Sequence, residues 1–480
     1  MGLLNFKKNE ITHSNIRMTI ISTIIFVTNY IFGLFLIKLI FPDKFGLITL
    51  IISTIELSAL LDGFRFDQLY YNRNSKNTGK ELFNYGLLRV FNALLAGIIS
   101  LVILGIFYHE LLFDKKFIFT FFLFIINKGI VGITTVFILE ATKKWQRYRY
   151  EQISLCFNIV ANLTALTLAW FGWQLTALVS KYLIAAILTF AYFLWKNYNL
   201  FEISPDRSIL KWYITRGIRL FPNNMVMNIS TRIDDIFIGY GISQAVLGVY
   251  SRAFQFVRLP VEFFSNNFLA NNYPLLLKHK DDANRIHQII EILICACIFF
   301  ISFFTLNFLS FIHWLIQYYW GEKWSLIFPI SLSLIFIPFG KPALDLLQNY
   351  MIVTEKYSKV NRVFVIYGII EIIAITVGFI FFNFWGVAIA QSVALLLGLM
   401  ILLNSSAISL RILEPILTSC LLILIFLYGA YLHFPYASFW GFITRLLIGN
   451  IIVIVYFFTI HRAIIQKLFH YLKHGEWNWD

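Results

Sequence analysis

Residues 294–312 read ICACIFFISFFTLNFLSFI and contain no charged side chain. A helix of this length, rising about 1.5 Å per residue, crosses about 30 Å of hydrocarbon. Similar runs recur along the whole chain, in which 59% of the 480 residues are hydrophobic and 13% are charged. Soluble domains carry about 25% charged residues. The sequence therefore predicts an all-α polytopic membrane protein.

The apolar runs predict about 14 transmembrane helices, with ends uncertain by a few residues. The predicted spans are Ile16–Phe41, Phe45–Tyr71, Tyr85–His109, Phe117–Thr142, Ile153–Trp173, Leu175–Trp195, Trp212–Gly241, Val246–Leu277, Ile286–Tyr318, Ser325–Val353, Val363–Phe384, Trp385–Leu403, Ile412–His433 and Phe439–Ile465. The seventh and eighth of these spans are the least apolar. Because every loop is short, function is expected inside the helical bundle.

Basic residues between the spans predict the orientation, since lysine and arginine accumulate in cytoplasmic loops. With the N-terminus inside, the inner segments hold most of them, including Lys143, Arg207, Lys356 and Arg462. An even number of spans then places the C-terminus inside as well. The same placement accounts for the net charge of +14 without nucleic acid as a partner. No cofactor or metal is expected, because the four cysteines have neither redox nor zinc spacing.

Three turns predict an internal repeat. PDKFGL at 42–47 has a counterpart in SQAVLG at 243–248, ATKK at 141–144 in VTEK at 353–356, and FGW at 171–173 in WGV at 385–387. The halves are six spans apart, so they enter from the same side and form a parallel pseudo-two-fold repeat. The predicted domains are a six-helix bundle over 1–200, a second over 201–405, and two extra helices with a basic tail over 406–480.

The middle of the chain carries the motifs of a known family. RIDDIFIG at 232–239, LGVYSRAF at 247–254, RLP at 258–260 and NYP at 272–274 resemble the seventh and eighth helices of O-antigen and exopolysaccharide flippases. FPDKFGL at 41–47 and LLDGF at 60–64 resemble the start of the same polysaccharide-transport proteins. These belong to the multidrug/oligosaccharidyl-lipid/polysaccharide exporter superfamily. The chain departs from the superfamily's drug-exporter branch, which usually has twelve spans.

The resemblance implies a MATE-like fold and a flippase in the bacterial cytoplasmic membrane. Its substrate would be an undecaprenyl-pyrophosphate-linked oligosaccharide, moved from the inner to the outer face by alternating access for O-antigen, capsule or exopolysaccharide synthesis. Membrane lipid, a polysaccharide polymerase and other assembly proteins are the implied partners. No enzymatic activity is expected.

Ionisable residues at membrane depth are candidate functional groups because they are costly there. Arg232, Arg258 and Lys341 are predicted to form a cationic cavity for the diphosphate. The alternative is that each cation pairs on its own helix, since Asp235, Glu262 and Asp345 follow three or four residues later. Asp62 likewise precedes Arg65 by three residues.

Other polar residues add two expectations. Asn224, Asn228 and Asn267 are candidate contacts for sugar hydroxyls, with helix–helix hydrogen bonding as the alternative. Asp62, Asp235 and Asp345 are candidates for ion coupling. A cation-coupled drug or metabolite antiporter of the same superfamily therefore remains the second functional reading, and a polymerase, ligase or glycosyltransferase the third.

Overall fold

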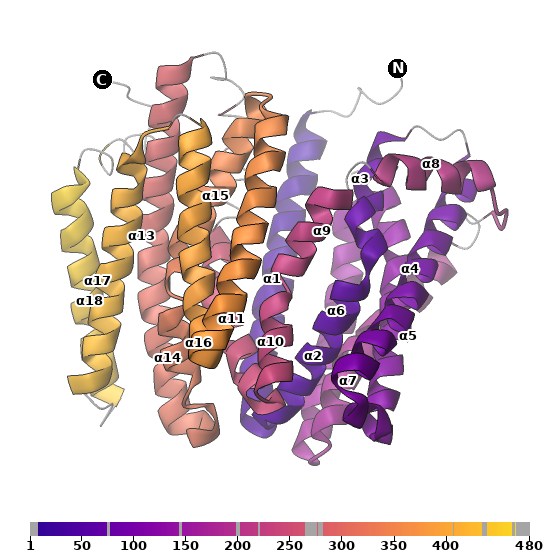
Figure 1. The fold of residues 1–480 in the computed structure, drawn as a ribbon, viewed down its shortest axis with the longest axis horizontal. Coiled ribbons are helices and arrows are strands. Elements are labelled where there is room, and N and C mark those ends of the chain that lie inside the picture. Colours follow the sequence, from indigo (N-terminus) through magenta and orange to yellow (C-terminus); the bar gives the residue numbers. More distant parts are fainter. Residues whose placement is uncertain are drawn as a thin grey trace. The chain divides into compact units, whose positions relative to one another are not determined.

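A computed structural model describes residues 8–73, 77–143, 146–197, 202–218, 221–264, 276, 282–406, 408–433, 439–462 and 466. Throughout these residues the regular structure is helical (Figure 1). The all-α class predicted from the sequence is therefore confirmed. By its internal contacts the chain divides into two units, Met1–Gly248 and Val249–Asp480.

The first unit is built around five long helices. Its elements are α1 (Lys8–Leu39), α2 (Pro42–Ser58), η1 (Leu60–Phe64), α3 (Phe66–Asn72), α4 (Thr78–Phe107), η2 (His109–Phe113), α5 (Lys115–Lys143), α6 (Arg147–Trp170), α7 (Gln174–Asn197), α8 (Arg207–Gly217), α9 (Phe221–Ser230) and α10 (Ile233–Gly241). Helix α6 packs against α1 and α7, and α4 packs against α5.

The predicted second span is broken rather than continuous. Helix α2 ends at Ser58, a 3-10 turn follows, and Arg65 adopts a left-handed backbone with φ 49° before α3 begins. Residues with a Cβ rarely take this conformation. The break leaves the irregular backbone of η1 within a predicted span, and in lipid such backbone persists only beside protein or a wet cavity.

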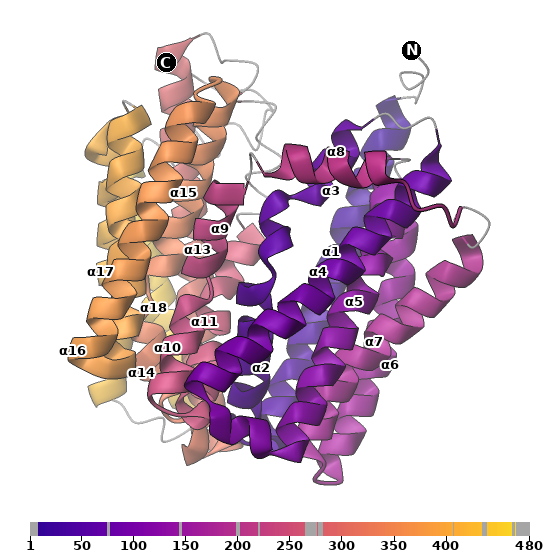
Figure 2. The same cartoon turned by 45° about the vertical axis from the view of Figure 1, so that its right-hand side comes forward.

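The predicted seventh span begins too early. Trp212 lies in α8, which runs crosswise to α4 and α5 in both views (Figures 1 and 2) and contacts α3, α4 and η1. Ile209 and Tyr213 on α8 are buried, whereas Lys211 and Arg216 are exposed. Such an amphipathic helix lies along a membrane surface. The remainder of the span is divided into α9 and α10.

Two glycines bring α2 and the start of α11 (Gln244–Phe264) into backbone contact. A Cβ on Gly46 would lie 1.7 Å from the Gln244 carbonyl oxygen, and one on Gly248 would lie 1.9 Å from the Pro42 carbonyl oxygen. Gly46 thus meets the carbonyl group four residues before Gly248, and Gly248 meets the carbonyl group four residues before Gly46. Gly46 and Gly248 come from the first pair of repeat turns, and this reciprocal contact is what a two-fold relation between those turns requires.

The second unit is organised around α13, whose interior contains the apolar run 294–312. Its further elements are α13 (Ala283–Leu315), η5 (Ile316–Trp320), η6 (Glu322–Trp324), α14 (Ile327–Ser333), α15 (Phe336–Val353), α16 (Tyr357–Ser406), η7 (Leu410–Ile412), α17 (Leu413–His433) and α18 (Phe439–Ile460). Helix α13 packs against α15, α17 and α18, and most of its side chains are buried.

Helix α16 contains two of the predicted spans. Phe382 and Asn383 leave helical geometry, and Gly378 and Gly386 on either side of them lie in backbone contact. The predicted boundary between Phe384 and Trp385 therefore falls within two residues of the break.

Nine helical stretches of the described residues are long and apolar enough to cross a membrane. The bent pair Glu322–Ser333 and Phe336–Val353, which meet at 45°, would make a tenth. The polytopic membrane class is confirmed. The count of fourteen, the orientation and the predicted domain boundaries stay predictions.

Candidate functional site

The break after α2 places Asp62 at the centre of a charged cluster in the first unit. Its Oδ1 accepts hydrogen bonds from Arg89 on α4 at 3.0 Å and from the Asn92 amide at 2.8 Å. Its Oδ2 accepts one from Lys128 on α5 at 3.0 Å. The Leu61 N–H donates to Asn92, which fixes the turn against α4. We call Asp62, Arg89, Asn92 and Lys128 the Asp62 cluster.

The Asp62 cluster carries more positive than negative charge. Two cations, Arg89 and Lys128, share one carboxylate. Lys128 lies about 20 Å from the start of α5, which is about 44 Å long, so it is far from either end of the helix. Its side chain is 22% exposed, so it is neither sealed in the core nor fully solvated. An excess cation in such an environment favours the binding of an anionic group, because the protein supplies incomplete compensation.

Arg232 lies among carboxylates, and the pair with Asp235 that was predicted as the alternative is formed. It forms ion pairs with Glu56 of α2 and, at 3.7 Å, with Asp235. The Ser53 hydroxyl donates to Asp235 Oδ2 at 2.6 Å, and the neighbouring Asp234 is also buried. Among the described residues, carboxylates therefore outnumber cations around Arg232, and we call Glu56, Arg232, Asp234 and Asp235 the Arg232 cluster.

The other two predicted cations, in the second unit, also have carboxylate partners. Arg258 lies 3.6 Å from Glu262, and Lys341 lies 2.8 Å from Asp345. The pairing alternative is thus realised at both positions, although half of the Arg258 side chain remains exposed. The convergence of Arg232, Arg258 and Lys341 on one cavity stays a prediction.

The three asparagine candidates have three different placements. Asn224 donates to the Gly63 carbonyl at 3.2 Å, which joins α9 to the turn that carries Asp62. The backbone carbonyl of Asn228 accepts a hydrogen bond from the Thr231 hydroxyl at the end of α9. Asn267 lies outside the described residues. Contact of any of these with sugar stays a prediction.

Sequence reasoning missed Arg89, Lys128 and Glu56. Each lies inside a predicted span, as does Lys181 of α7, so the rule that flagged Arg258 would have found them. Their partners were not foreseeable from spacing, because Arg89 and Lys128 lie 27 and 66 residues from Asp62.

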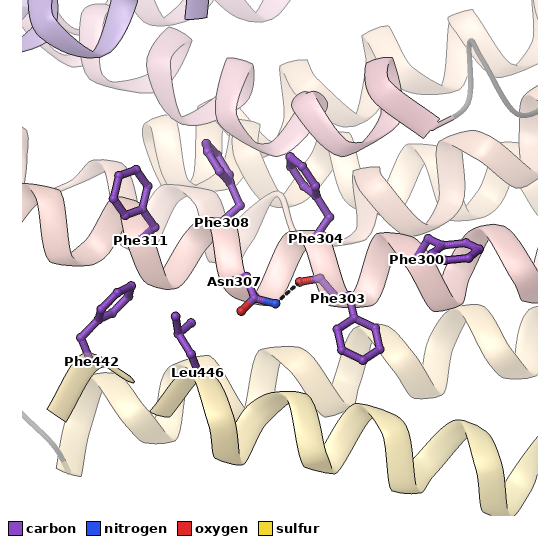
Figure 3. Close-up of a pocket in the computed structure, with 8 residues that line it drawn as sticks. All are labelled: Phe300, Phe303, Phe304, Asn307, Phe308, Phe311, Phe442 and Leu446. Atoms are coloured by element: carbon purple, nitrogen blue, oxygen red, sulfur yellow. Dashed lines mark hydrogen bonds between the residues drawn. The ribbon is translucent and has the colours of Figure 1, made fainter. Parts of the chain in front are cut away.

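An apolar groove of about 530 Å³ lies in the second unit between α13 and α18 (Figure 3). Its walls are mainly phenylalanine rings, and the lining residues are Phe300, Phe303, Phe304, Asn307, Phe308, Phe311, Phe442 and Leu446. Asn307 and Asn450 exchange two amide hydrogen bonds, of 2.8 and 3.0 Å. This pair satisfies the amide groups of both side chains and leaves the groove apolar.

Residues 35–329 match the profile of a protein family described as polysaccharide biosynthesis protein. The match covers more than half of the chain. The chain belongs to this family. A comparison with curated protein sequences found no match.

Several solved structures share the fold of this chain. The lipid II flippase MurJ, in an inward closed conformation, matches with a TM-score of 0.68 and 19% identity, over 93% of this chain and 100% of that chain. An inward-facing multidrug resistance MATE family transporter of the MOP superfamily matches with a TM-score of 0.58 and 13% identity, over 85% of this chain and 99% of that chain. An outward-facing transporter of the same family matches with a TM-score of 0.53 and 11% identity, over 85% of this chain and 96% of that chain. The chain therefore has the exporter-superfamily fold that its motifs predicted.

Proposed function

We propose that this protein is a flippase for undecaprenyl-pyrophosphate-linked oligosaccharide, which it moves from the inner to the outer face of the bacterial cytoplasmic membrane by alternating access. The cargo would serve O-antigen, capsule or exopolysaccharide synthesis. The observation that carries the proposal is the Asp62 cluster, a site with excess positive charge between helices in a polysaccharide biosynthesis family member.

The chemistry of a diphosphate suits this cluster. Arg89 offers a planar fork of donors that stays charged, and Lys128 offers a compact ammonium. A diphosphate oxygen at these two groups would share them with Asp62, replacing part of the hydration that it loses in the membrane. Asp62 holds both cations in place until the cargo arrives, so they need not be stored unpaired in a low-dielectric region.

The apolar groove between α13 and α18 has walls suited to hydrocarbon. A polyprenyl chain is a long hydrocarbon, and its burial against phenylalanine rings is favourable by about 25 cal/mol per Å² relative to water. Within a bilayer that gain is small, so the groove would guide the chain rather than provide most of the affinity.

The Arg232 cluster favours a second candidate, a cation-coupled drug or metabolite antiporter. Asp235 is buried, accepts from Ser53, and lies among more carboxylates than cations. A carboxylate of this kind suits proton or sodium coupling. Such coupling is also compatible with a flippase, so the decisive difference between the two candidates is the cargo.

Deletion of the gene in its own host tests the proposal. We expect loss of surface polysaccharide and accumulation of the lipid-linked repeat unit on the cytoplasmic face, where a reagent outside the membrane does not reach it. Restoration by the wild-type gene is the control. Normal surface polysaccharide together with altered drug tolerance would instead establish the antiporter.

A further inference from the structure

A cavity with polar side chains in its lining lies inside the first unit, among α1, α5, α6 and α7. Its volume is about 400 Å³. Amides, hydroxyls and one ammonium group line it, contributed by Asn29, Asn127, Thr134, Asn158, Lys181 and Thr189. No carboxylate is among its lining residues. We call it the α5–α7 cavity.

The α5–α7 cavity and the Asp62 cluster lie at the same depth. Asn127 lines the cavity, and the next residue, Lys128, binds Asp62. Consecutive residues of a helix point in directions about 100° apart. Helix α5 therefore separates the two sites by little more than its own width, and both lie midway along it.

Several polar side chains that line the cavity keep hydrogen-bond acceptors. The hydroxyls of Thr134 and Thr189 donate to carbonyls one turn earlier on their own helices, at 2.8 and 2.6 Å, so their lone pairs remain. The Asn158 amide nitrogen is likewise engaged, by Ser154. Asn127 Oδ1 is buried and has no hydrogen-bond partner among the described residues.

An unpaired buried acceptor indicates a missing donor, because nearly all buried polar atoms in folded proteins are satisfied. A metal ion is disfavoured here, since the cavity holds the Lys181 ammonium and its lining offers no negative ligand. A polyhydroxylated ring fits better. Its hydroxyls donate to the threonine and asparagine oxygens and accept from Lys181, and the Tyr182 ring also lines the cavity, offering a face for sugar C–H groups.

We propose that the α5–α7 cavity binds a sugar ring of the lipid-linked oligosaccharide. The inference rests on the proposed function, because the proposed function supplies the glycan. The protein would recognise the glycan within one bundle, separately from its recognition of charge.

Binding to the full-length protein in lipid nanodiscs tests this. One ligand is undecaprenyl pyrophosphate, and the other is the lipid-linked repeat unit purified from the host. The wild type should bind the glycosylated lipid more tightly. Asn127→Leu keeps the number and branching of the side-chain heavy atoms and removes an unpaired acceptor, so the melting temperature should hold or rise. We expect this variant to bind the glycosylated lipid about tenfold more weakly, with binding of the bare lipid unchanged.

Two further variants separate the possible outcomes. Thr167→Val removes a comparable hydroxyl from an exposed position on α6 and should leave both affinities unchanged. Arg89→Gln should weaken both lipids. If the wild type binds both lipids equally, or if Asn127→Leu keeps the preference, the sugar assignment is wrong while the flippase proposal stands. If the wild type binds neither lipid, both proposals fail.

Discussion

Lys128 and Arg258 are both cations within helices, but they differ in how fully neighbouring carboxylates neutralise them. Lys128 shares Asp62 with Arg89, so one positive charge is left over in a restricted space. Arg258 has its own carboxylate at 3.6 Å and is half exposed. At the scale of single residues, the ratio of cations to carboxylates in a cluster determines which sites suit an anionic cargo.

Lys128→Met should stop export without removing the protein from the membrane. Asp62 keeps Arg89 and Asn92 as partners, so the stability loss should stay below about 3 kcal/mol. The excess charge disappears, and affinity for undecaprenyl pyrophosphate should fall at least about tenfold. Protein abundance and surface polysaccharide measure the two effects. Lys128→Arg should retain export, and normal export by Lys128→Met would remove the Asp62 cluster from the account.

Arg258→Ala should insert stably, because an exposed ion pair contributes only about 0–1 kcal/mol. If Arg258 binds cargo, surface polysaccharide is lost while abundance is normal. Glu262→Gln is the matched control, since it breaks the same pair and leaves the arginine. Equal loss of abundance in both variants would show a structural pair, and normal polysaccharide in Arg258→Ala would exclude a role in cargo binding.

Spacing along one helix made part of the site predictable. Pairs three or four residues apart share a helix face, and the pairs at Arg232, Arg258 and Lys341 are all present. The pair of Asp62 with Arg65 is not formed among the described residues. The backbone turns left-handed at Arg65, which ends the helical face on which that prediction depended.

At the scale of elements, breaks in helices decide where polar groups lie. The turn η1 carries Asp62, and the boundary between α9 and α10 carries Arg232. Hydropathy averages over about a full span and does not register the seven-residue break between α2 and α3 or the two-residue break between α9 and α10, so the sequence predicted continuous helices at both places. The break in α16 was foreseen because Trp385 and Gly386 form a recognisable turn signal between two apolar runs.

Gly46→Ala tests the contact between α2 and α11. The added methyl group would meet the Gln244 carbonyl oxygen at 1.7 Å, where neither backbone has room to retreat. We expect a loss of about 3 kcal/mol or more, seen as a lower melting temperature in detergent and lower abundance.

Gly33→Ala in α1 is the control for this contact. A Cβ at Gly33 meets nothing within 4 Å, and alanine is the better helix former. Its melting temperature should be unchanged or slightly higher. If Gly46→Ala behaves in the same way, the two helices do not approach as closely as described.

At the scale of the whole molecule, composition predicted the helical membrane class, and the resemblance of the motifs to a known family predicted the fold. Apolar content fixed the helical membrane architecture, because only helices or closed barrels satisfy backbone groups in lipid. The clusters were less predictable, since Arg89 and Lys128 meet Asp62 only after three separate elements have packed together.

The predicted topology can be checked by reporters. Fusions after Lys144, Arg207, Lys356 and Lys473 should report the cytoplasm, and fusions after Lys116 and Lys323 should report the outside. The reason is that the segments around the four cytoplasmic positions are rich in lysine and arginine, whereas the segments around the two outside positions hold few. A reversal at any one of these six positions would show that a span has been miscounted.

Translocation by the purified protein in vesicles tests the central claim most directly. The vesicles contain the host's lipid-linked repeat unit, and an impermeant glycosidase or lectin reports the share of glycan on the outer leaflet over time. The account predicts that wild-type protein makes the inner-leaflet glycan progressively accessible, whereas Lys128→Met leaves only the initial outer-leaflet share accessible. If wild-type vesicles show the same accessible share as protein-free vesicles, the protein does not flip this lipid and the account is contradicted.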